Sequence, residues 1–155
     1  MNLNNLSKMQ SNRLSNWLII SVAVFSFLGL LDAGYLTASH YMAFDPGCTV
    51  FGDCDTVLKS QYSKLFGIPV QAFGVVYYLI IFILSIIIID TGNLKMARNL
   101  GWLTILGLAA SVYFMFLQTF VIKAYCQYCV ASAATSTLLF VLGMSILKNI
   151  KRWGN

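Results

Sequence analysis

The sequence predicts an all-α integral membrane protein: a bundle of four transmembrane helices with a short amphipathic helix in its first outer loop. Of its 155 residues, 59% are hydrophobic and only 10% are charged, whereas about 25% are charged in soluble domains. The mean hydropathy is +0.77. A water-facing globule of this size cannot bury so much apolar surface. The apolar residues also gather into four runs, as expected for helices that cross a membrane.

The charge pattern argues against one class of partner. The net charge is +5, which alone would suit nucleic-acid binding. The basic residues, however, are scattered at the ends of apolar segments, and aromatic residues do not interleave with them. We therefore expect no nucleic-acid partner. The first apolar run lacks a small-residue cleavage site, so we interpret it as a retained helix and not as a signal peptide.

The N-terminal part of the chain predicts a tail and a first span. Residues 1–16 are polar and predict a poorly ordered tail, and the span covers about 17–39. Crossing the hydrocarbon takes about 20 residues of helix, so the span must continue past Asp32. A carboxylate inside the membrane is costly. It either handles protons beside an active site or is satisfied by water or by a hydroxyl such as that of Tyr35 or Thr37, and we favour the second interpretation.

Residues 41–68 form the one sizeable loop of the predicted bundle, and they carry Cys48 and Cys54. Proline and glycine residues punctuate turns within this loop. Residues 55–66 place apolar side chains close to one helical face, with Asp55 as a candidate N-terminal cap. We therefore expect a short amphipathic helix there, which lies on the membrane surface and covers the bundle.

Three further spans complete the predicted bundle, over about 69–89, 100–121 and 126–147. Pro69 suits the first turn of the second span, where its missing N–H does no harm. Small residues in the third span allow helices to approach closely. Residues 148–155 form a second tail.

The distribution of lysine and arginine predicts how the membrane domain, residues 17–147, is oriented. Four spans place both termini on one side, and that side holds seven basic residues: Lys8, Arg13, Lys95, Arg98, Lys148, Lys151 and Arg152. The other side holds three: Lys59, Lys64 and Lys123. The positive-inside rule then puts the termini in the cytoplasm and the cysteines outside. We expect a bacterial inner-membrane protein whose cysteines face the oxidising periplasm, where disulfides persist.

The four cysteines form two pairs on this outer side. Cys126 and Cys129 begin the fourth span, where a helix N-terminus favours the thiolate, and Cys48 and Cys54 lie in the loop. Two pairs at one membrane face predict an electron relay by thiol–disulfide exchange. Because the second pair lies at the end of an apolar bundle, the natural acceptor is a lipid-soluble quinone, ubiquinone or menaquinone, and the donor is a soluble dithiol protein.

Two other interpretations of the cysteines compete with the relay. Four cysteines can bind zinc, but the spacing of Cys48 and Cys54 is looser than that of zinc sites, so we expect no metal. The cysteines could also be structural staples in a membrane protein without turnover. Replacing any cysteine would then chiefly lower stability, whereas in the relay Cys129→Ser abolishes quinone reduction while the fold survives.

Several short motifs follow one another in a specific order. They are Gly34-Tyr35-Leu36 at the end of the first span, Cys48-x5-Cys54 and then Ser60 in the loop, Gly67-Ile68-Pro69 through Phe73-Gly74 and Tyr77 at the second span, and Cys126-x-x-Cys129 at the fourth. Over roughly residues 17–147, the chain thus resembles the vitamin K epoxide reductase family, specifically its bacterial single-domain members. The related quinone oxidases of the DsbB type carry their Cys-x-x-Cys in the first outer loop instead.

The resemblance implies a role for each motif residue. Cys129 is the quinone-proximal cysteine, Cys126 exchanges with Cys54, and Cys48 faces the soluble partner. Ser60 assists exchange or quinone reduction. The resemblance also implies a quinone pocket lined by Phe73, Gly74, Tyr77 and Ala133. Since the sequence shows no fused thioredoxin-like domain, a separate periplasmic thioredoxin-fold (DsbA-like) protein is implied as the partner.

Two positions depart from the vertebrate members of that family. The vertebrate members have a tyrosine where this chain has Ala133, and an asparagine where it has Val70 and Gln71. In those members, the tyrosine and the asparagine help to hold vitamin K. The resemblance therefore implies an oxidoreductase that forms disulfide bonds and reduces a quinone. Reduction of a quinone or of vitamin K epoxide with another electron donor is the alternative.

Overall fold

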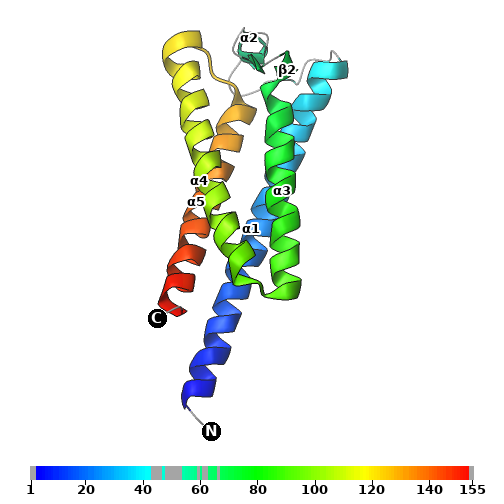
Figure 1. Cartoon of the computed structure of the whole chain (residues 1–155). Coiled ribbons are helices and arrows are strands. Elements are labelled where there is room, and N and C mark those ends of the chain that lie inside the picture. Colours follow the sequence, from blue (N-terminus) through cyan, green and yellow to red (C-terminus); the bar gives the residue numbers. More distant parts are fainter. Residues whose placement is uncertain are drawn as a thin grey trace.

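Four long helices form a bundle in this computed structural model (Figure 1). The structure describes residues 3–42, 47, 54–58, 60, 63–65 and 67–153, of which 3–15, 54–55, 65 and 151–153 are described by their backbone alone. The four helices are α1 (Leu3–Met42), α3 (Val70–Thr91), α4 (Leu94–Phe116) and α5 (Gln127–Trp153). Both termini lie at one end of the bundle (Figure 1). The opposite end, here named the loop end, carries the short helix α2 (Cys54–Leu58) and two short strands.

The bundle has the surface of a multi-pass membrane protein. Among the described residues, four segments are long and apolar enough to span a membrane: Asn16–Met42, Val70–Thr91, Leu94–Ile122 and Gln127–Ile150. Large apolar side chains are exposed on the outward faces of all four, for example Leu28, Ile83, Leu106 and Val141. Such faces suit contact with lipid, and this confirms the predicted all-α, four-span fold.

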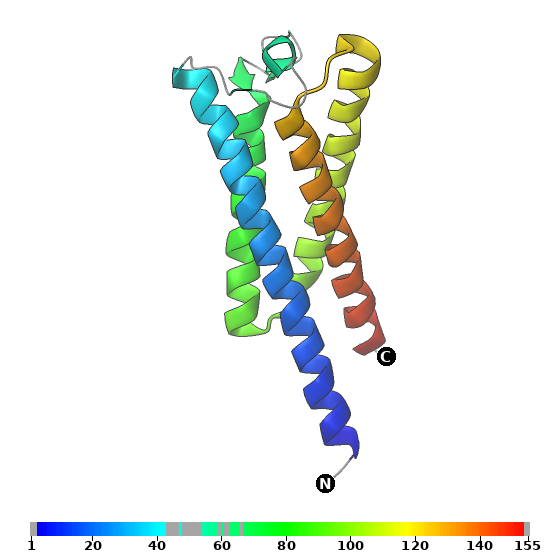
Figure 2. The same cartoon turned by 180° about the vertical axis from the view of Figure 1, so that it is seen from behind.

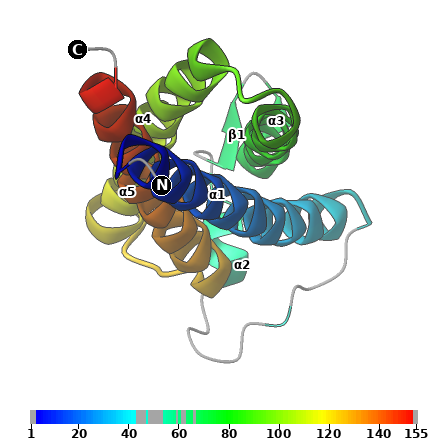
Figure 3. The same ribbon diagram turned by 90° about the horizontal axis from the view of Figure 1, so that it is seen from below.

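The helices pack through narrow buried faces. Helix α1 packs against both α3 and α5, and α4 packs chiefly against α5 (Figures 2 and 3). Gly101 and Gly143 make the α4–α5 contact close, because a Cβ atom on either would overlap Leu147 or Thr104 on the facing helix. Helices α3 and α4 contact each other less than these pairs do, and a cavity described below lies between them.

The helix ends show local sequence signals. Gly92 ends α3 in the left-handed conformation (φ 61°), and its N–H donates to the Ile88 carbonyl at 2.9 Å. Asn93 caps α4 by accepting from the N–H of Lys95 at 3.0 Å. Helix α4 continues without a break into a π-helical turn, η2 (Leu117–Ile122). Lys123 ends that turn with a φ of 55°, which is uncommon for a residue other than glycine.

The structure corrects the predicted N-terminal tail and the predicted length of the loop helix. Residues 3–16 are helical and extend α1; no glycine or proline interrupts them, so the helix can continue past the apolar run. The loop helix, predicted over 55–66, is confirmed as a short helix but ends at Leu58. The chain beyond it turns at Ser60 and Ser63.

Serine side chains and a hairpin explain why the loop helix stops. The hydroxyls of Ser60 and Ser63 each donate at 2.7 Å to the carbonyl three residues earlier, which offers the backbone an alternative to the helix. Strand β1 (Lys64–Leu65) then pairs antiparallel with β2 (Ile68–Pro69). Gly67, with a φ of 82°, allows the tight reversal between them.

Candidate functional site

Cys126 occupies the N-cap position of α5 at the loop end. Its carbonyl accepts the first helical hydrogen bond, from the Val130 N–H at 3.0 Å. Its side chain is 0% exposed and shares a buried apolar cluster with residues from α1, from α2 and from the segment before α5: Leu36, Val57, Leu58 and Ala124. Cys129 is half-buried and packs against the same cluster. The two thiols therefore lie at the boundary between the loop end and the membrane-spanning part of the bundle.

The environment of Cys126 favours its thiolate. A hydrogen bond from the Cys129 thiol, followed by bonds from the backbone N–H groups of Cys129 and Tyr128, lowers the Cys126 pKa to about 7, against an ordinary value of about 8.5. Burial acts in the opposite direction but is outweighed. The free N–H groups of a helix N-terminus commonly have this effect on a cysteine. A large share of Cys126 is therefore reactive thiolate at neutral pH.

Gln118 holds both cysteines from the π-helical turn η2. Its side chain is 3% exposed. Its Oε1 accepts from the backbone N–H of Cys126 at 3.2 Å, and its amide group donates to the sulfur of Cys129. Sequence reasoning missed this residue. The one available signal is an amide within an apolar run eight positions before Cys126, and π-helical turns frequently occur at functional sites.

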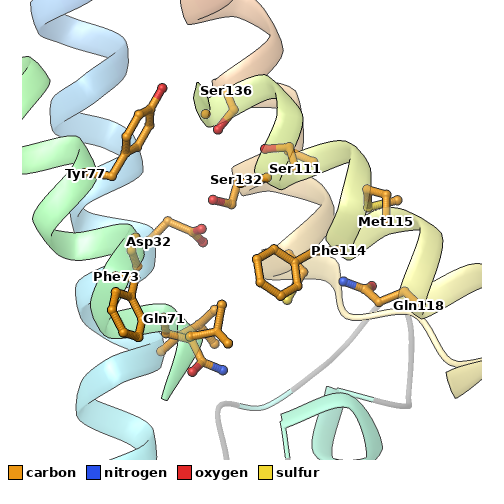
Figure 4. Close-up of a pocket in the computed structure, with 18 of the residues that line it drawn as sticks. Asp32, Gln71, Phe73, Tyr77, Ser111, Phe114, Met115, Gln118, Ser132 and Ser136 are labelled. Atoms are coloured by element: carbon orange, nitrogen blue, oxygen red, sulfur yellow. The ribbon is translucent and has the colours of Figure 1, made fainter. Parts of the chain in front are cut away.

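A cavity of about 380 Å³ lies beneath the loop end, enclosed by α1, α3, α4, α5 and the loop. Its lining is mostly apolar, and its volume falls within the range of small-molecule sites, about 300–1,000 Å³. Of the residues predicted for the site, six line it: Ser60, Phe73, Gly74, Tyr77, Cys129 and Ala133. Figure 4 shows Phe73 and Tyr77 on one side of this space and Phe114 with Ser132 on the other. The cavity thus gathers residues that are far apart in the sequence around one thiol.

Three buried polar atoms near the cavity lack hydrogen-bond partners. Asp32 Oδ2, Gln71 Oε1 and Tyr77 Oη are buried and have no hydrogen-bond partner, and among the described residues they are the three side-chain atoms in this state. All three residues line the cavity (Figure 4). Buried polar groups are nearly always hydrogen-bonded in folded proteins. The cavity therefore suits a mainly apolar ligand that brings a few polar atoms of its own.

Tyr78 forms the rigid wall of the cavity next to these groups. Its side chain is 1% exposed, and its hydroxyl lies 2.9 Å from the hydroxyls of both Ser132 and Ser136 and 2.9 Å from the Ser132 carbonyl. These bonds join α3 to α5 one helical turn below Cys129. On the other side Gly29 of α1 contacts the Tyr78 ring, and a Cβ atom there would overlap it.

The remaining predicted residues are only partly placed. Cys48 lies outside the described residues, and Cys54 is described by its backbone alone, as the first residue of α2. Val57 and Leu58 of the same helix belong to the cluster that contains Cys126. Within the part of the chain that the structure describes, no group of three or more His, Cys, Asp or Glu side chains could hold a metal ion.

Comparison with known proteins identifies a matching family and a curated relative. The pattern of the Vitamin K epoxide reductase family fits residues 20–144. The thiol-disulfide oxidoreductase LTO1 of Arabidopsis thaliana is 33% identical over 128 residues, which is 77% of this chain and 34% of that protein. The chain thus spans about a third of the length of the relative it matches.

Proposed function

This chain belongs to the vitamin K epoxide reductase family of membrane oxidoreductases, and we propose that it transfers electrons from a thioredoxin-fold dithiol protein to a membrane quinone. The observation that carries this proposal is the cavity beside Cys129. It is largely apolar, it adjoins a reactive thiol pair, and it contains three buried polar atoms without partners. A quinone supplies the matching chemistry, because it is a flat apolar ring with two carbonyl oxygens.

The polar groups of the cavity fit both redox states of a quinone. The Tyr77 hydroxyl can donate a hydrogen bond to a quinone carbonyl. The Gln71 Oε1 can accept one from a hydroxyl of the hydroquinone product. Ala133 lies one helical turn after Cys129 and, like Gly74 of α3, adds little bulk to the cavity wall, which leaves room for a ring near the sulfur. Which quinone is used, ubiquinone or menaquinone, depends on substituents and on membrane supply.

The proposed reaction moves two electrons through two cysteine pairs. The dithiol of the partner protein reduces the Cys48–Cys54 disulfide and becomes a disulfide itself. A thiolate of this loop pair, which the family resemblance assigns to Cys54, then attacks Cys126 and displaces Cys129 as a thiol. Resolution of this mixed disulfide restores Cys48–Cys54. Finally the Cys126–Cys129 dithiol becomes a disulfide again as the quinone takes up two electrons and two protons.

The placement of α2 supports the step between the two pairs. Val57 packs in the same buried cluster as Cys126, and Cys54 begins the helix that contains Val57. Because a helix rises about 1.5 Å per residue, the backbone of Cys54 is only about one turn from Val57. A small movement of the loop could therefore bring a loop thiolate to Cys126.

We further propose that the loop end faces the periplasm of a bacterial inner membrane. Lys95 and Arg98 are exposed near the end of the bundle where the termini lie, and the sequence places seven of ten basic residues on that side. The positive-inside rule assigns that side to the cytoplasm. A thioredoxin-fold (DsbA-like) partner would then meet the cysteines in an oxidising compartment.

A single-turnover experiment tests the proposal. The purified protein is reduced, freed of reductant without oxygen and mixed with a soluble quinone analogue, and quinone absorbance is followed. We expect two quinones reduced per wild-type molecule, one by the Cys126–Cys129 dithiol and a second after the loop dithiol has reduced that pair again, with all four cysteines becoming resistant to alkylation. Cys129→Ser should abolish quinone reduction, whereas the matched variant Cys54→Ser should reduce a single quinone per molecule. If the folded wild-type protein reduces no quinone and each cysteine change only lowers stability, the cysteines are staples and the proposal is wrong.

A further inference from the structure

Asp32 is a half-buried acid whose carboxyl group lines the cavity, with its Oδ2 atom fully buried. We propose that Asp32 donates a proton to the quinone as it is reduced; this inference rests on the function proposed above. Figure 4 shows its carboxyl group between the α3 side chains and Ser132 of α5. Asp32 is the one carboxyl group among the described residues that line the cavity.

The Tyr35 and Thr37 hydroxyls, considered from the sequence as partners, do not bond to the Oδ2 atom of Asp32. Thr37 donates its hydroxyl to the Ala33 carbonyl of its own helix at 2.7 Å. Tyr35 packs its ring against Tyr128, with centroids 5.5 Å apart. Asp32 Oδ2 remains buried without a partner. An unpaired carboxylate in such a place is costly, whereas the neutral acid is less so and carries a transferable proton.

Among the described residues, the ionisable groups near Asp32 are two cysteine thiols and two tyrosine phenols. Its charge interacts with both thiols, Cys126 and Cys129 of α5, and with Tyr78 of α3. Tyr77 of α3 lines the same cavity. Among the described residues that line the cavity, those of α4 and of the loop have no ionisable side chain. Asp32 is therefore the acid best placed to reach both the sulfur atoms and a ring that lies next to them.

The proton balance of quinone reduction gives an independent reason to expect a proton donor besides the two thiols. Reduction of a quinone to a hydroquinone consumes two electrons and two protons. Cys126, with a pKa of about 7, is a thiolate in about half of the molecules at neutral pH. In those molecules the thiol pair supplies both electrons but only one proton, from Cys129. The balanced step begins with the Cys126 thiolate, the Cys129 thiol, neutral Asp32 and the quinone. The two sulfur atoms form the disulfide and supply two electrons, Cys129 and Asp32 each supply one proton, and the products are the disulfide, the hydroquinone and the Asp32 carboxylate. The carboxylate regains its proton from water before the next turnover.

The test compares Asp32→Asn with Asp90→Asn, which makes the same change at an exposed position near the C-terminal end of α3, outside the cavity lining. In the single-turnover assay, Asp32→Asn should reduce the quinone roughly 10²- to 10⁴-fold more slowly, the usual contribution of a general acid. Asp90→Asn should match the wild type, and Asp32→Glu should restore part of the rate. At high pH the wild-type advantage over Asp32→Asn should shrink, because Asp32 is then ionised and has no proton to give.

Two further readouts separate a catalytic acid from a structural anchor. Reduction of the Cys126–Cys129 disulfide by a dithiol without quinone, followed by alkylation, should be unchanged in Asp32→Asn. Asp32→Leu should be at least as stable as the wild type but slow with quinone, whereas loss of a structural anchor would lower stability.

The possible failures are distinguishable. If wild-type protein reduces quinone and Asp32→Asn does so at the same rate and with the same pH profile, the inference is refuted while the proposed function stands. If wild-type protein exchanges disulfides but reduces no quinone, the proposed function fails, and this inference fails with it.

Discussion

Replacing Gln118 with methionine removes the amide that holds both cysteines of α5. In the native structure the Oε1 atom of Gln118 accepts from the Cys126 N–H at 3.2 Å, and the amide nitrogen donates to the Cys129 sulfur. Methionine is similar in length and fills irregular space well, so little packing is lost. The variant therefore isolates the effect of the hydrogen bonds.

The expected loss of stability follows from burial. Cys126 is 0% exposed, so water cannot replace the lost acceptor of its N–H. A buried donor without a partner costs about 1–3 kcal/mol, and we expect the free energy of unfolding to fall by that amount. Gln118→Glu should behave differently, because it keeps an acceptor but brings a negative charge to the thiols. It should raise the pKa of Cys126 and slow its alkylation at neutral pH.

Denaturant unfolding in detergent measures the first effect, and the rate of iodoacetamide alkylation against pH measures the second. The matched control is Thr119→Ser, at the next position of the same π-helical turn, where the side chain is exposed and the serine keeps the hydroxyl that bonds to Met115 and Tyr125. The control should change stability by no more than about 0.5 kcal/mol. If Gln118→Met is as stable as the control, the amide does not hold the cysteines and the reasoning is refuted.

Three other predictions concern the cavity wall and the thiols. Tyr78→Phe removes a buried hydroxyl with three contacts at 2.9 Å and should lower the free energy of unfolding by about 1–3 kcal/mol, measured by the same unfolding curves; no loss would mean that the α3–α5 link carries no stability. Gly107→Ala places a Cβ atom on the Tyr77 phenol, so the ring must move and KM for quinone should rise; an unchanged KM would remove Tyr77 from the quinone site. Alkylation of Cys126 should rise with pH around a midpoint near 7, and Cys129→Ala should shift that midpoint upward; a midpoint near 8.5 in both proteins would contradict the thiol–thiol hydrogen bond.

The four membrane helices could be predicted because each satisfies its backbone hydrogen bonds within one apolar run. The loop could not be predicted as well. Its apolar pattern over 55–66 favours a helix, but the hydroxyls of Ser60 and Ser63 and the pairing of Lys64–Leu65 with Ile68–Pro69 compete with that helix. Where the loop helix ends therefore depends on side-chain hydrogen bonds and strand pairing, which the spacing of apolar residues does not reveal.

The functional site, too, could be predicted from the sequence only in part. The spacing of Cys126 and Cys129 indicates redox chemistry without any structure, and the family resemblance suggested Ser60 and Tyr77, which line the cavity. Gln118 was missed because a π-helical turn and a reversal at Lys123 bring it back to the cysteines. For Asp32, only the packing of four helices shows that its buried oxygen has no partner.

The most direct test of the whole account is the stoichiometry of the full relay. Oxidised protein, a reduced thioredoxin-fold oxidase and a soluble quinone analogue are mixed without oxygen, and quinone loss and partner oxidation are measured together. The proposed relay predicts one quinone reduced for each partner disulfide formed, over many turnovers, and no turnover with Cys129→Ser. Partner oxidation that stops after the protein's own disulfides are consumed, with no quinone reduced by well-folded protein, would contradict it.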